Sequence, residues 1–284
     1  MNHLPYKHLL CRALLLGTTL AAASTWGATQ AAPGLPPWQV MEFEQKAFWA
    51  TAKSRVEVAE KPGTDKQQWN LSATSSVVGN SEDVVVTLSA STGQVIQRSR
   101  LSSGKDKRFK TFNYQADHVV RNRRNPGPDP ATPPLQWSIS SSKKIDYPQS
   151  VEGAVITDAY ALLLLAQRLL SSPEQVAKVV VHTDFNFYQV HMTSGKGITI
   201  PVDYQVTGGQ AVSGMRETRA VKLQISPVEP LAEKPDFSLL GLHGYIILLF
   251  DQETEQLLQL RGTAPRIGPT EINLKSITPR IPPE

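Results

Sequence analysis

Cysteine and the motifs of the common enzyme classes are scarce in this 284-residue sequence. The single cysteine, Cys11, excludes an internal disulfide. There is no GxGxxG motif, no P-loop, no GxSxG nucleophile elbow, no HExxH and no CxxC. Nucleotide binding, acyl transfer by a nucleophile elbow and zincin-type hydrolysis therefore lack the scaffolds that they normally use. We expect a non-enzymatic protein with neither a cofactor nor a metal ion.

Long apolar runs are also missing from most of the chain. With 40% hydrophobic and 19% charged residues, the composition is that of an ordinary globular protein. The most apolar internal stretch, Leu239–Phe250, has twelve residues and is interrupted by two glycines and a histidine. Because a membrane-spanning helix needs about 20 apolar residues, this stretch is too short. Its second half, Tyr245–Phe250, fits a strand covered on both faces.

The N-terminal segment has the layout of a secretory signal peptide. The basic residues Lys7 and Arg12 precede a short apolar stretch, residues 13–23, and small residues follow it. This arrangement predicts cleavage after Gly27 or after Ala31. An uncleaved N-terminal anchor is the alternative interpretation.

Cleavage would leave a mature chain, residues 32–284, without cysteine. Loss of Lys7 and Arg12 lowers the formal charge from +4 to +2. A cysteine-free chain suits an oxidising compartment, where a stray thiol is a liability. We therefore predict that residues 1–31 are a signal peptide, and that residues 32–284 form a single β-rich domain in the periplasm, exported and soluble.

Alternating apolar and polar residues predict strands over much of the mature chain. Val84–Ala90, Ile198–Val206 and Glu217–Ile225 alternate clearly, and Val179–Met192 reads as one long strand. A proline-rich insert at 125–134 contains five prolines in ten residues, so we expect neither a helix nor an inner strand there.

One helix is predicted over Ala159–Leu170, with Thr157 as its cap and Asp158 in its first turn. Its middle is apolar on every side, which indicates a buried helix. A short second helix is expected from Ser172-Pro173 onward. The order of strands, one helix and more strands predicts an α+β fold: a strongly curved, half-barrel-like antiparallel sheet with one buried helix on its concave face.

The nearest thing to a reactive constellation lies within the predicted strand Val179–Met192. Period-two spacing puts His182, Asp184 and Asn186 on one face and Phe185 and Phe187 on the other. The polar trio could hold a metal ion or a general base, or it could be a solvated strand face. We expect the solvated face.

Nine Lys and Arg residues between 98 and 124 stand against two Asp residues, a local charge of +7. Phosphates of lipid head groups or lipopolysaccharide are more plausible partners for an exported protein than nucleic acid, which we do not expect as a partner. The candidate contacts with an anionic surface are Lys105, Lys107, Arg108 and Lys110. Alternatively, these charges protect a hairpin edge from aggregation.

The chain resembles an uncharacterised exported bacterial family, domain of unknown function 3108, over residues 43–277. The resemblance rests on element order and on the strings Thr157–Leu162, Val179–Val206, Gly244–Ile247 and Leu260–Gly262. It implies a fold similar to the LolA/LolB-like lipoprotein carriers, in which a curved half-barrel and a plugging helix enclose an apolar cavity. It implies no catalytic residue. The insert at 125–134 is longer than the family pattern.

These observations favour a periplasmic binding or carrier module for an apolar or lipid-like ligand. The residues expected to line its cavity are Leu162, Leu163, Leu165, Phe185, Phe187 and Tyr245. The alternative is a structural or protein-interaction factor of the cell envelope, which would use the basic segment as its contact surface.

Overall fold

The computed structural model describes residues 34–47, 50–63, 67–104, 107–231 and 234–280. The predicted signal peptide therefore lies outside the described residues. The described part contains one α-helix and a 17-stranded sheet. The first eight strands are β1 (Trp38–Ala47), β2 (Ala50–Glu60), β3 (Gln68–Val77), β4 (Asn80–Ser89), β5 (Val95–Ser103), β6 (Arg108–Tyr114), β7 (His118–Asn125) and β8 (Ser138–Asp146).

The second half of the chain supplies the helix and the remaining strands. These elements are β9 (Ile156–Thr157), α1 (Ala161–Leu170), β10 (Val176–His182), β11 (Phe187–Lys196), β12 (Ile200–Val206), β13 (Ala211–Arg216), β14 (Thr218–Pro227), β15 (His243–Asp251), β16 (Leu257–Ala264) and β17 (Gly268–Pro279). Two short 3-10 turns, Pro134–Gln136 and Gln149–Val151, flank β8.

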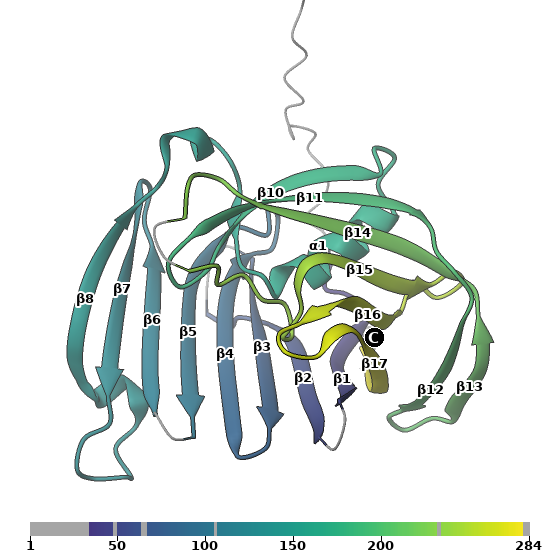
Figure 1. Ribbon diagram of the computed structural model, residues 1–284, viewed down its shortest axis with the longest axis horizontal. Coiled ribbons are helices and arrows are strands. Elements are labelled where there is room, and N and C mark those ends of the chain that lie inside the picture. The colour runs from purple at the N-terminus through teal and green to yellow at the C-terminus, as the bar shows by residue number, and fades with distance from the viewer. Residues whose placement is uncertain (1–33, 48–49, 64–66, 105–106, 232–233, 281–284) are drawn as a thin grey trace, which may run out of the picture. The chain divides into compact units, whose positions relative to one another are not determined.

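The sheet is built from two antiparallel runs that meet at β1 and β17. Strands β1 to β8 pair in sequence order, and β17 pairs with the other side of β1. Beyond β17 follow β16, β15, β14, β11 and β10. Figure 1 shows β1–β8 side by side, with β10, β11 and β14 running across α1.

The prediction of a wholly antiparallel sheet is wrong in two places. Strand β9 pairs with β10 in parallel, and β12 pairs in parallel with the second half of β17. These parallel pairs make the sheet mixed. The sheet is not closed into a barrel, because its terminal strands β8 and β9 do not pair with each other among the described residues.

Alternating apolar residues give β2, β3 and β4 one buried face. Val56, Leu71 and Val86 are fully buried, and the register places Val56 opposite Ala73 and Leu71 opposite Val86. Each such side chain contributes about 1.5–3 kcal/mol when it leaves water. A slip of one residue would turn the whole apolar set outward, so this face fixes the register.

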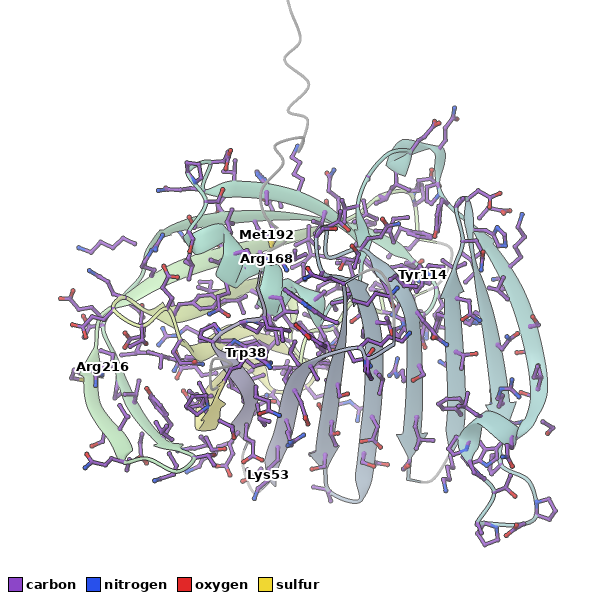
Figure 2. All side chains as sticks on the ribbon, turned by 180° about the vertical axis from the view of Figure 1, so that it is seen from behind. Trp38, Lys53, Tyr114, Arg168, Met192 and Arg216 are labelled. Atoms are coloured by element: carbon purple, nitrogen blue, oxygen red, sulfur yellow. The ribbon has the colours of Figure 1, made fainter. Side chains whose placement is uncertain are left out.

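The helix α1 is buried, as its sequence predicts. Gln167 accepts a hydrogen bond from the Trp38 indole at 2.9 Å, and Arg168 donates to the carbonyl oxygen of Ala90 at 2.8 Å. Arg168 is itself part of α1 and is labelled in Figure 2. Among the described residues, no helix has both the length and the apolar character needed to span a bilayer.

The predicted helix cap is wrong. Tyr160 occupies the N-cap position, and no side chain caps the helix. Thr157 belongs to β9 and donates to the carbonyl oxygen of Gly93 at 2.7 Å. The Asp158 carboxylate accepts the Tyr160 backbone N–H at 2.9 Å and also faces Arg98. The short second helix is absent too, because the chain turns at residues 171–175 and enters β10 at Val176.

The single long strand predicted over Val179–Met192 is instead a hairpin. Strand β10 ends at His182 and β11 begins at Phe187, directly opposite it. The Thr183 backbone N–H donates to the Asn186 carbonyl oxygen at 3.0 Å and closes the turn. Since opposed residues share a face, Phe187 lies on the face of His182 and not on that of Val181. The alternation continues across the turn in sequence, which is why it resembles one strand.

Candidate functional site

A cleft of about 680 Å³ lies beside the inner faces of β2–β5. Its other walls come from residues 158–160 before α1, the β10–β11 turn, the segment 236–241 and the β16–β17 turn. Small polar side chains from the sheet line much of it, and they include Ser54, Ser75, Ser81, Ser102 and Ser103. Ser54 and Ser75 share a hydrogen bond of 3.1 Å between their hydroxyls.

Arg98 on β5 connects the buried charged residues that line the cleft, Arg98, Asp158 and Asp184, which we call the charged floor. Its guanidinium donates to the Asp158 carboxylate at 3.0 Å, to the His182 carbonyl oxygen at 3.0 Å and to the Thr183 carbonyl oxygen at 2.7 Å. Arg98 is 6% exposed and Asp158 is 2% exposed. A buried charge persists only when it is paired and hydrogen-bonded, so this network locks β5, the helix approach and the β10–β11 turn into one arrangement.

Asp184, in the β10–β11 turn, is shared by three cations. Its carboxylate accepts a hydrogen bond from Lys110 and lies 3.3 Å from an Arg100 nitrogen and 3.5 Å from an Arg98 nitrogen. Burial acts to raise the pKa of Asp184, but the three positive charges outweigh burial and lower this pKa to about 2. The carboxylate is therefore ionised throughout the physiological range.

His182 is packed among aromatic rings and is neutral near pH 7. Its Nδ1 lies 3.0 Å from the Tyr114 hydroxyl, and its ring centroid is 4.6 Å from that of Phe187. Burial, with the nearby charge of Arg98, holds the pKa of His182 well below its usual value of 6.5. Figure 2 shows Tyr114 on the sheet that carries β5–β8. The Nε2 atom is buried without a hydrogen-bond partner in the described part of the chain.

The expectation that His182, Asp184 and Asn186 form a solvated strand face is wrong. They are 0%, 7% and 4% exposed, and only His182 belongs to a strand. Asn186 donates to Asp236 at 2.8 Å, and Asp236 also accepts the Phe185 backbone N–H at 3.0 Å. These hydrogen bonds fix the β10–β11 turn to the segment 234–238. No group of three or more potential metal-binding side chains occurs within the described residues.

Apolar side chains also line the cleft, and two of them are exposed. Val77 and Ile267 are 44% and 38% exposed, and both belong to the lining. Arg100, which also lines the cleft, pairs with Glu82. Burial raises the pKa of the Tyr160 hydroxyl, so Tyr160 presents a neutral phenol to the cleft.

The residues predicted to line an apolar cavity are dispersed. Leu162, Leu163 and Leu165 are 0%, 1% and 4% exposed in the core, and none of them lines the cleft. Phe187 packs on His182. Tyr245, on β15, is 52% exposed.

Phe185, in the same predicted set, lies against cations. Its ring centroid is 4.8 Å from the Arg121 guanidinium and 5.8 Å from the Lys110 ammonium. These two cation–π contacts place the Phe185 ring beside charged side chains of β6 and β7. Whether any residue of the predicted set contacts a ligand remains a prediction.

Of the four predicted basic contacts, the three that the structure describes do not form one surface. Lys105 lies outside the described residues. Lys107 is exposed, and its ammonium is 5.3 Å from the Trp137 ring. Arg108 is partly buried at the start of β6, and Lys110 turns inward to Asp184. Sequence reasoning missed the inward set, because a bulge between Val95 and Gln97 shifts the alternation and turns Arg98 and Arg100 toward the face of Val84 and Val86.

Scans against family models and curated proteins match nothing in this sequence. A search of solved structures finds a β-barrel-like protein of domain of unknown function DUF1849 from Brucella abortus, with 7% identity and a TM-score of 0.46. The match covers 85% of this chain and 96% of that one. These comparisons identify neither domain of unknown function 3108 nor the LolA/LolB-like carriers. Of that expectation, the structure supports the coarser part, a β-rich fold.

Proposed function

We propose that this protein is a non-enzymatic binding module that holds an amphipathic, lipid-like ligand in the cleft beside β2–β5. The observation that carries the proposal is the cleft itself: about 680 Å³, with apolar and small polar side chains beside the charged floor. Sites for small ligands typically have 300–1,000 Å³ and combine apolar walls with a few fixed polar groups. The apolar part of the ligand lies against Val77, Ile267 and Ala52, and its polar end points to Arg100.

In this proposal the sheet is a half-barrel and α1 fills its concave face. The leucines of α1 then belong to a solid core, and the ligand occupies the space next to the helix approach at 158–160. Binding without catalysis is supported by the pairing of the charged groups. Asp158 and Asp184 are both engaged by Arg98, and His182 is tied to Tyr114. Groups committed to each other in this way are poorly placed to act as acid or base on a ligand.

An envelope interaction factor is the second candidate. It is favoured by β8, which pairs with β7 on one side and has no strand partner on its other side among the described residues. An open strand edge can accept a strand from a partner protein. Lys143 and Lys144 on the same strand act against indiscriminate pairing.

Blocking the cleft tests the binding proposal. Ser75→Trp places a large ring in the cleft, whereas Thr74→Trp puts the same ring on the opposite, exposed face of β3. A dansyl-labelled fatty acid serves as the probe, with native mass spectrometry of the purified protein as a second readout. We expect Ser75→Trp to lose probe binding and Thr74→Trp to keep it. Equal binding by the two variants, or no binding by the unmodified protein, would overturn the proposal.

The proposed site of action is the periplasm, after loss of residues 1–31. The basic and apolar N-terminal pattern and the cysteine-free remainder support this. N-terminal sequencing of protein recovered from the periplasm should begin at Ala28 or Ala32. Retention of Met1 together with a tight membrane pellet would overturn it.

A further inference from the structure

Cations stand directly opposite one another across three neighbouring strands next to the cleft. Arg100 on β5 faces Lys110 on β6, and Lys110 faces Arg123 on β7. In the adjacent row Arg121 on β7 faces Lys143 on β8. Figure 1 shows β5–β8 side by side, so these positions form one continuous area. Neighbouring strands are about 4.8 Å apart, and like charges directly opposite each other destabilise a sheet.

The nearby carboxylates neutralise this positive charge only in part. Asp158 pairs with Arg98, Glu82 pairs with Arg100, and Asp184 serves Arg98, Arg100 and Lys110. Arg121 donates to the backbone carbonyl oxygen of Asp184 at 3.1 Å and pairs with no carboxylate among the described residues. Within the residues that the structure describes, the two rows carry six cations and three carboxylates face them, which leaves a formal charge of +3. These six are Arg98, Arg100, Lys110, Arg121, Arg123 and Lys143.

Three of these cations have a donor without an acceptor in the described part of the chain. The Nε atoms of Arg98, Arg100 and Arg123 are buried and have no hydrogen-bond partner there. Neither Arg123 nor Lys143 has a carboxylate within 4.0 Å among the described residues. A buried unpaired donor costs about 1–3 kcal/mol, so an acceptor supplied from outside would be stabilising here.

We infer that Lys110, Arg123 and Lys143 bind a phosphate-type oxyanion, the head group of the ligand whose apolar part occupies the cleft. The inference rests on the proposed function. Arg100 belongs to the cleft lining and begins the row, so the anion site continues from the floor of the cleft toward β8.

A tetrahedral oxyanion suits this arrangement. The guanidinium of Arg123 offers a planar fork of N–H donors, and the two ammonium groups supply point charges on either side of it. The hydroxyl of Ser141, exposed on β8 and opposite Arg123, adds a further donor. Burial together with Arg100 and Arg121 lowers the pKa of Lys110 despite Asp184, which is consistent with a local shortage of negative charge.

The test compares three probes by isothermal titration calorimetry: dodecyl phosphate, dodecyl maltoside and inorganic phosphate. The variants are Arg123→Gln with Lys143→Gln, and Lys144→Gln as the matched control. Lys144 is on the same strand, carries the same charge and is paired with Asp146 on the other face. We expect the double variant to bind dodecyl phosphate roughly 10- to 100-fold more weakly, as for lost charge-assisted hydrogen bonds. Its affinity for dodecyl maltoside should change less than about twofold.

The outcomes separate the two proposals. Unchanged dodecyl phosphate affinity in the double variant, or an equal loss in Lys144→Gln, would overturn the anion site while leaving the cleft proposal intact. Failure of both dodecyl probes would overturn the cleft proposal. If inorganic phosphate then still binds and the double variant loses it, the oxyanion site stands with free phosphate as its source. If phosphate does not bind either, both proposals fall. Thermal unfolding of each variant without ligand checks that the fold is intact.

Discussion

Asp184 offers the sharpest test of how the charged floor is held together. Its carboxylate is 7% exposed and faces Arg98, Arg100 and Lys110. Its pKa falls from 3.8 to about 2 on folding. At about 1.4 kcal/mol per pH unit, the ionised carboxylate contributes roughly 2–3 kcal/mol to stability at pH 7. Because the folded pKa is the lower one, this contribution is complete well above pH 3.8 and is lost as the pH falls through about 2.

The substitution Asp184→Asn should cost more than that figure at pH 7. It leaves three clustered cations without their shared carboxylate, and breaking a buried ion pair typically costs about 3–5 kcal/mol. We expect a loss of this size in urea unfolding followed by tryptophan fluorescence at pH 7. The gap between the two proteins should narrow as the pH is lowered from about 4 to about 2, because protonation removes the same charge.

The control is Asp203→Asn, whose exposed carboxylate lies 3.8 Å from Lys275. Exposed ion pairs contribute about 0–1 kcal/mol, so this change should be nearly silent. A pH-independent gap between Asp184→Asn and the unmodified protein, or a gap as small as that of the control, would refute the reasoning.

The remaining predictions concern packing. Gly93→Ala should destabilise the protein by about 1–3 kcal/mol more than Gly153→Ala. Both glycines have a positive φ, of 72° and 73°, but a Cβ at Gly93 would lie 2.8 Å from Leu165 whereas the one at Gly153 meets open space. Comparison of the two by urea unfolding isolates the clash, and equal losses would contradict it. Leu162→Ala, in the solid core, should cost about 2–5 kcal/mol, and Tyr245→Ala less than about 0.5 kcal/mol. A small loss at Leu162, read by melting temperature, would place a void next to the helix.

The order of apolar and polar residues correctly predicted those elements whose pattern lies within a single segment of the chain. The alternation over Val84–Ala90 is β4, and the apolar stretch within Ala159–Leu170 is the buried helix α1. The same pattern failed at the β10–β11 turn, because the alternation of apolar and polar residues continues through that turn. Between His182 and Phe187 the chain reverses, and the sequence shows no glycine or proline there to mark it.

The charged floor could not be found by spacing. Arg98 is 60 residues from Asp158 and 84 from His182, and only the folded sheet brings them together. Strand parity gave no signal either, because the bulge between Val95 and Gln97 shifts the alternation within β5. In the folded sheet, Arg98 and Arg100 occupy positions that an inward-facing strand normally gives to apolar residues, which indicates buried partners. The Lys and Arg residues between 98 and 124 were interpreted as one surface, although side chains that alternate along a strand point to two opposite faces.

The pairing of β1 with β17 also determines the order in which the molecule can assemble. Arg280 donates to the carbonyl oxygen of Trp38, 242 residues away, and β17 supplies the hydrogen bonds for one side of β1. Contacts so distant in sequence are slow to form, since a long loop must close before they stabilise anything. A chain emerging from its N-terminal side therefore exposes an unpaired β1 edge until β17 arrives. During that interval the nascent molecule can pair wrongly or aggregate, so its yield in the cell should depend on a chaperone that holds the chain unfolded until synthesis is complete.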